Sequence, residues 1–129
     1  MRPKGESGSS AIEFVFAMAV LLLLTLGVIE VALVLYGRNV LMASAHEGAR
    51  AAVELGTTRG DATRIATETV RRAARGLVDD LGVGVVLDDN AGRFEARVRV
   101  SGALEALGPV PVRIPVSVVA RASRSNPEP

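Results

Sequence analysis

The sequence predicts an α+β chain: one long N-terminal, partly transmembrane helix, a second amphipathic helix, and a small antiparallel sheet of about three strands at the C-terminus. Three observations predict it. Residues 14–36 are apolar with a single charge, Glu30. Residues 61–78 repeat apolar side chains at three- and four-residue spacing, which is the period of a helix. Residues 94–100 alternate apolar and charged side chains, which is the period of a half-buried strand.

The apolar segment is long enough to cross a bilayer. Its 23 residues, Phe14 to Tyr36, would extend roughly 35 Å as a helix, against a hydrocarbon core of about 30 Å. A short leader, residues 1–8, precedes it, and Arg2 and Lys4 there favour a cytoplasmic N-terminus. No proline interrupts residues 38–55, so we expect one helix over residues 9–56, ending at Gly56.

The distal part of this helix has small side chains along one stripe. Serine, alanine and glycine recur at helical spacing from Ser44 to Ala52, so another helix or a sheet could approach closely. An alternative interpretation is a secretory signal cleaved after Ala43-Ser44-Ala45, which would release a module starting at His46. The apolar run is much longer than the roughly 7–15 residues of such signals, which disfavours this alternative.

The second helix is predicted from Asp61 to Val78, with Asp61 as the capping carboxylate and Gly60 as the chain break before it. Arg64 and Glu68 are spaced for an i,i+4 ion pair. The polar side of this helix is rich in arginine. We interpret it as a solvated face, and the alternative is contact with anionic lipid headgroups or a partner.

The C-terminal third predicts three strands, over residues 83–87, 94–100 and 112–120. The sequence Asp88-Asp89-Asn90-Ala91-Gly92 is typical of a turn, and it lacks the loop pattern of a calcium site. Residues 102–111 are predicted to form a loop. Pro115 indicates that the third strand lies at a sheet edge. Residues 57–122 would thus form a small extracytoplasmic domain, followed by a disordered tail over residues 123–129.

The composition excludes several classes of site. The chain has no cysteine, one histidine and no tryptophan, so thiolate chemistry and multi-histidine metal sites are excluded. A net charge of +1 gives no indication of a nucleic-acid partner. We find no cofactor motif and no nucleophile beside His46, and we expect no enzymatic activity. Glu47 and Arg50 are instead spaced for an ion pair.

Two carboxylates lie on the apolar helix, where acidic side chains are costly and usually functional. Glu13 is about one helical turn after Ser9. A cut between Gly8 and Ser9 would free an amine that could pair with Glu13, in the same or a neighbouring chain, and set the register between chains. Alternatively, the helix stays uncut and Glu13 reaches the headgroups. Glu30 lies roughly 25 Å further along the helix and is predicted to face Arg38 or a partner helix.

Four stretches of this sequence carry a resemblance. Gly8, four residues, then Glu13-Phe14 at the start of an apolar helix resembles the type IV prepilin processing site in its Flp/Tad form. The continuation is similar to TadE-like pseudopilins in Gly27-Val28-Ile29-Glu30, in Tyr36-Gly37-Arg38-Asn39-Val40-Leu41 and in Glu47-Gly48-Ala49-Arg50-Ala51-Ala52-Val53.

The resemblance implies a minor pilin-like component of a tight-adherence pilus, with a role in assembly, adhesion or secretion. A prepilin peptidase would cut after Gly8, Ser9 would become the N-terminus, and Glu13 and Phe14 would serve assembly. The chain would cross the bacterial cell membrane once, with its N-terminus in the cytoplasm, among membrane lipid, other pilins or pseudopilins and assembly platform proteins. A helix–helix interface is predicted at Glu30, Arg38, Glu47, Gly48 and Arg50. The alternative function is an uncleaved single-pass anchor that helps assemble or secrete another protein.

Overall fold

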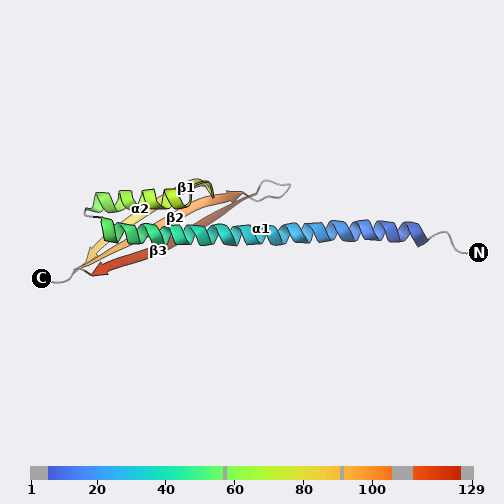
Figure 1. The fold of residues 1–129 in the computed structure, drawn as a ribbon, viewed down its shortest axis with the longest axis horizontal. Coiled ribbons are helices and arrows are strands. Elements are labelled where there is room, and N and C mark those ends of the chain that lie inside the picture. The colour runs from blue at the N-terminus through green and yellow to red at the C-terminus, as the bar shows by residue number, and fades with distance from the viewer. Residues whose placement is uncertain (1–5, 57, 91, 106–111, 126–129) are drawn as a thin grey trace, which may run out of the picture.

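The computed structural model describes residues 6–56, 58–90, 92–105 and 112–125 and confirms the α+β class. The elements are α1 (Glu6–Leu55), α2 (Arg59–Ala73), β1 (Asp79–Asn90), β2 (Arg93–Glu105) and β3 (Arg113–Ser125). Figure 1 shows a small domain at one end of a single long helix, whose N-terminal half projects away from the domain.

Helix α1 has 50 residues and is therefore about 75 Å long. It begins at Glu6, inside the predicted leader, and ends one residue before Gly56, as the sequence predicts. The Gly56 N–H donates to the carbonyl oxygen of Ala52 at 3.2 Å. A Cβ on Gly56 would lie 2.5 Å from that oxygen and 2.6 Å from the Cβ of Ala62, so only glycine fits this close turn into α2.

Helix α2 differs from its prediction at both ends. Its N-cap is Thr58, whose hydroxyl accepts from the N–H of Asp61 at 3.2 Å and donates to the Asp61 carboxylate at 3.0 Å. Asp61 therefore lies within the first turn, and Gly60 is helical instead of breaking the chain. The helix ends at Ala73, five residues before Val78. Gly76, with φ of 75°, then turns the chain so that β1 can begin at Asp79.

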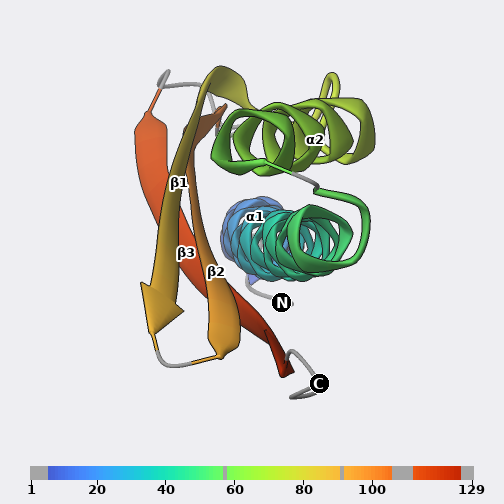
Figure 2. The ribbon, with the colours of Figure 1, turned by 90° about the vertical axis from the view of Figure 1, so that its left-hand side faces the viewer.

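The sheet is an antiparallel meander in the order β1-β2-β3, visible edge-on beside both helices in Figure 2. Its strands are longer than predicted. Asp88 and Asp89 pair with Glu95 and Phe94, so the chain reverses only between Asn90 and Arg93. Gly102, predicted to lie in a loop, pairs with Val116. Cross-strand backbone hydrogen bonds extend strands through sequences that look like turns in isolation.

The third strand likewise runs beyond its prediction, because Ser123 to Ser125 continue the ladder beside Glu95 to Arg93 and do not form a tail. Strand β3 is an edge strand, as Pro115 indicated, and Pro115 lies opposite Ala103. The rest of the predicted loop (residues 106–111) and of the predicted tail (residues 126–129) lies outside the described residues.

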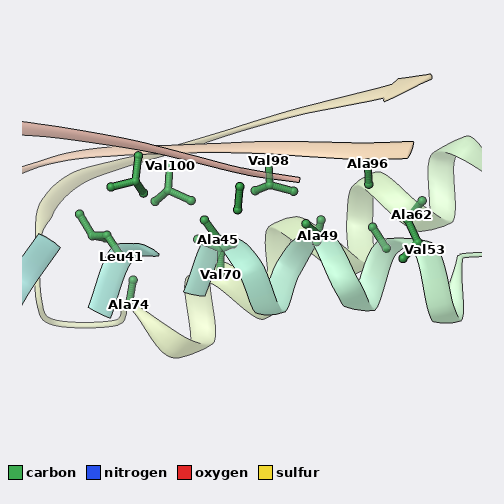
Figure 3. Packing of buried hydrophobic residues seen from close by; sticks show 14 residues of the cluster. Leu41, Ala45, Ala49, Val53, Ala62, Val70, Ala74, Ala96, Val98 and Val100 are labelled. Atoms are coloured by element: carbon green, nitrogen blue, oxygen red, sulfur yellow. The ribbon is translucent and has the colours of Figure 1, made fainter. Parts of the chain in front are cut away.

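Both helices pack on one face of the sheet, α1 against β2 and β3 and α2 against β1 (Figure 2). The core is built from alanine and valine, with Leu41 the largest fully buried side chain (Figure 3). The predicted small-residue stripe of α1 therefore exists and permits this close packing. Its buried small members are Ser44, Ala45, Gly48 and Ala52; Ala51, also predicted, is half-buried, and Ala49, which was not predicted, is buried beside them.

Gly48 gives a direct test of the contact between the helices. A Cβ at this position would lie 2.8 Å from Cγ2 of Val70 and 3.1 Å from the carbonyl oxygen of Ala66. We expect Gly48→Ala to lower the free energy of unfolding by about 1–3 kcal/mol, because the added methyl group overpacks the interface. Urea denaturation of the full chain in detergent micelles, followed by circular dichroism, measures this.

Gly60→Ala is the matched control, since a Cβ there would meet only the Thr58 hydroxyl at 3.9 Å. We expect no loss of stability in the control. Equal stability of the Gly48→Ala variant and the parent protein would contradict the close contact of α1 and α2.

Candidate functional site

The first candidate site is the projecting part of α1, residues 8–29, which we call the stalk. All its residues are exposed except the half-buried Leu26. Phe16, Leu23 and Val28 keep 71%, 67% and 70% of their surface exposed. Burying one such side chain is worth about 1.5–3 kcal/mol, so the stalk needs lipid or other helices around it.

The stalk is suited to a bilayer in both length and composition. Helix α1 is long and apolar enough to cross a membrane, and none of its most apolar stretch is buried inside the chain. Between Glu13 and Glu30 there are 16 uncharged residues, which as a helix extend about 24 Å. This length is suited to a hydrocarbon core of about 30 Å, because Glu13 and Glu30 at its two ends can reach the headgroups.

Glu13 lies on the open surface of the stalk, next to the exposed Phe14. Among the residues that the structure describes, Glu13 has neither an ion pair nor a hydrogen bond. Gly8 and Ser9 are also exposed and belong to the first turns of the helix. Ser9 and Glu13 are four residues apart, about 6 Å along the axis and on nearly the same side of the helix.

Glu30 lies where α1 meets the domain, and it is half-buried. It lines a cavity of about 420 Å³ together with Leu33, Val34, Leu77, Leu104 and Ile114. We call this the base cavity. Gly37 forms part of its wall, and a Cβ there would lie 2.9 Å from both methyl carbons of Leu104. Residues of β2, β3 and the α2–β1 connection thus reach the level of Glu30.

The predicted Glu30–Arg38 contact is absent from the described part of the chain, where neither side chain forms an ion pair. The base cavity is instead bordered by further acids, Asp79 and Glu105. Arg113 lies 3.9 Å from Asp79 and 3.4 Å from Asp80, so one cation is shared by two carboxylates. Sequence periodicity could not reveal this cluster, because its members come from four separate elements.

The remaining predicted interface residues do not form one site. His46, Glu47 and Arg50 are exposed, whereas Gly48 is buried against α2. Arg50 pairs with Glu54 at 3.3 Å, one turn ahead, and not with Glu47 as predicted. The i,i+4 spacing brings the two side chains together better than i,i+3 does here. Nothing in this arrangement joins a base to a nucleophile.

The arginine-rich face of α2 is solvent-exposed in this chain, as interpreted from the sequence. Arg64 and Glu68 form the predicted pair at 3.8 Å, and Arg72 contacts the same carboxylate at 3.0 Å. Exposed pairs of this kind contribute about 0–1 kcal/mol each, so they add little to stability. Among the described residues, no group of three histidine or acidic side chains could hold a metal ion.

Comparison with known proteins relates the N-terminal part of the chain to a sequence family. Residues 8–50 match the sequence family described as TadE-like protein. The matched segment contains the stalk, the wall of the base cavity that α1 provides, and most of the small-residue stripe. No curated protein and no solved structure gives a significant match.

The absence of cysteine allows a direct test of the stalk's environment. In reconstituted vesicles, a single cysteine replacing Leu22 in the stalk should resist a membrane-impermeant maleimide and react once detergent is added. A cysteine replacing the exposed His46 should react without detergent on chains whose domain faces outward. Rapid labelling of Leu22→Cys in intact vesicles would contradict a membrane-embedded stalk.

Proposed function

We propose that this chain acts as a pseudopilin of the Tad pilus system, because residues 8–50 match the family described as TadE-like protein. The stalk inserts into the cytoplasmic membrane, a prepilin peptidase removes residues 1–8, and the processed chain takes part in pilus assembly. Its domain is outside the membrane and its processed N-terminus faces the cytoplasm. The role is structural, without a reaction of its own.

The observation that supports this most is the contrast between the two halves of α1. The domain-proximal half is packed into a core, with Leu41, Ala45, Ala49 and Ala52 fully buried. The stalk has no packing partner within the described part of the chain. A rigid helix that supplies a domain core at one end and offers a bare apolar surface at the other is suited to lateral assembly with similar helices.

Within this proposal, the position of Glu13 supports a role for this residue in setting the axial register between neighbouring chains. It lies at the inner end of the charge-free stretch, where a carboxylate needs a cationic partner. Removal of residues 1–8 would place an amine at Ser9, four residues away. In a neighbouring chain the same amine could pair with Glu13 and fix how far the two helices are offset along their axes.

Two alternatives are separated by specific observations. An uncleaved single-pass anchor is favoured by the continuity of α1, which runs through Gly8 to Glu6 without a break. A module released by cleavage after Ala45 is disfavoured, because Ser44 and Ala45 are buried and the cut would also remove Leu41 from the core. The membrane-bound forms therefore remain the two candidates, and the mature N-terminus distinguishes them.

Mass spectrometry of the chain purified from membranes tests the processing. We expect a mature protein that starts at Ser9. Gly8→Leu should leave only the full-length form, because a bulky residue before the scissile bond prevents the cut. Gly27→Leu is the control: it adds the same side chain at an open position on the stalk and should be processed normally.

An intact leader in the parent protein would favour the uncleaved anchor. A start at His46 would overturn both membrane-bound candidates and support the released module.

Replacement of Glu13 tests the register role separately from processing. We expect Glu13→Gln and Glu13→Ala to be cut after Gly8 at a normal level but to reduce pilus number at least tenfold, because the partner of the new amine is lost. Electron microscopy counts the pili and mass spectrometry follows the cut. Glu54→Gln is the control, because Glu54 is an exposed acid far from the stalk. Normal piliation in both Glu13 variants would refute the register role.

A further inference from the structure

The base cavity lies at the outer end of the stalk. Glu30 comes directly after the charge-free residues 14–29, so it lies at the level where the hydrocarbon ends and the domain begins. The walls around it are mostly apolar, from Leu33 and Val34 on α1 and from Leu104 and Ile114 on the sheet. A volume of about 420 Å³ is within the range of sites that hold a ligand or a group of side chains.

The charges around the base cavity favour a cationic occupant. Glu30, Asp79 and Glu105 line it, and Asp80 is beside it through its contact with Arg113. Four carboxylates thus face one arginine in this region. Glu30 and Glu105 have no ion pair among the described residues. A carboxylate this close to hydrocarbon is costly unless a cation neutralises it.

The apolar walls and the unpaired acids together favour an occupant that has an apolar stem and a cationic end. Lysine and arginine bury an apolar stem while their charged ends stay near polar groups. Such a side chain, projecting from a membrane helix, would place its stem along Leu33 and Leu104 and its charge at Glu30. A soluble metal ion fits less well, because the described acids do not form a metal-binding group.

A second copy of this chain is a poor source of that cation. Two copies in register would bring Glu30 beside Glu30, and like charges repel. The charge-free stretch offers no lysine or arginine at this depth. Arg38 of another copy would reach Glu30 only after an axial offset of about 12 Å.

We propose, on the basis of the pseudopilin function, that the base cavity is the docking site for a lysine or arginine on the membrane helix of a different pilus subunit, with Glu30 as its counter-charge. This contact is at the outer end of the stalk and is independent of Glu13 at the inner end. It gives the chain a means of selecting its neighbour by charge.

Synthetic membrane peptides can replace the natural subunit in a test of this docking site. The full chain, labelled at a cysteine replacing His46, is reconstituted in lipid vesicles with a leucine–alanine transmembrane peptide. One peptide carries a single lysine near its outer end, and its match carries glutamine there. Energy transfer measures the association of the peptide with the labelled chain. We expect the lysine peptide to associate about three- to tenfold more strongly than the glutamine peptide, which is the size of effect that polar contacts between membrane helices have.

Glu30→Gln should abolish this preference, whereas Glu54→Gln should keep it, because Glu54 is exposed and outside the base cavity. Cysteine cross-linking locates the contact. A cysteine replacing Leu33, which lines the base cavity, should cross-link to the lysine peptide when its thiol carries a photoreactive label. A cysteine replacing Leu35, two residues away and not part of the lining, should cross-link much less.

Equal association of the two peptides, or a preference that survives Glu30→Gln, would overturn the proposal. So would cross-links from the labelled Leu33→Cys that join only two copies of this chain, or that capture only lipid. The measurement does not depend on cleavage after Gly8. A negative result would therefore refute the docking site, while the mature N-terminus would still decide the pseudopilin function.

Discussion

The close contact between the small-residue stripe of α1 and the rest of the domain is the interaction on which the structure depends. Glycine and alanine at 45, 48, 49 and 52 let α2 and the sheet approach the helix backbone. The core has few large side chains, so its packing depends on the close approach of the backbones more than on the volume of the side chains. The same helix continues into the stalk without a break. The domain and the stalk are thereby joined through one continuous helix.

Along this continuous helix the two carboxylates have different surroundings. Glu13 is exposed on the stalk and has no ion pair or hydrogen bond among the described residues. Glu30 is half-buried where α1 meets the domain. It lines the base cavity, whose other acids, Asp79 and Glu105, outnumber the one nearby arginine, Arg113. One acid at each end of a charge-free stretch also limits how far the helix can slide along the membrane normal, since moving either acid into hydrocarbon is costly.

Local sequence patterns predicted the elements but not their limits. A long apolar run predicted the first helix and a β-branched run predicted the first strand. The period of the apolar residues predicted α2 and the other two strands, because those residues face a common core. The turn-forming Asp88-Asp89, the loop-like Gly102 and the polar Ser123 were assigned wrongly. Each lies in a strand because its neighbour in the sheet provides backbone hydrogen bonds, and that neighbour is distant in sequence. The start of α2 was misplaced because the Thr58 hydroxyl caps the helix.

The sequence alone determined that a long apolar helix with Glu13 and Glu30 would dominate this protein, because hydrophobic period and isolated charges are local properties. It also determined the family resemblance, which the match over residues 8–50 confirms. Only the tertiary structure decided that α1 is half stalk and half core, that Arg50 pairs with Glu54 and that Glu30 lines an acidic cavity. These depend on which surfaces meet when the helices and the sheet pack together, and no spacing along the chain encodes that geometry.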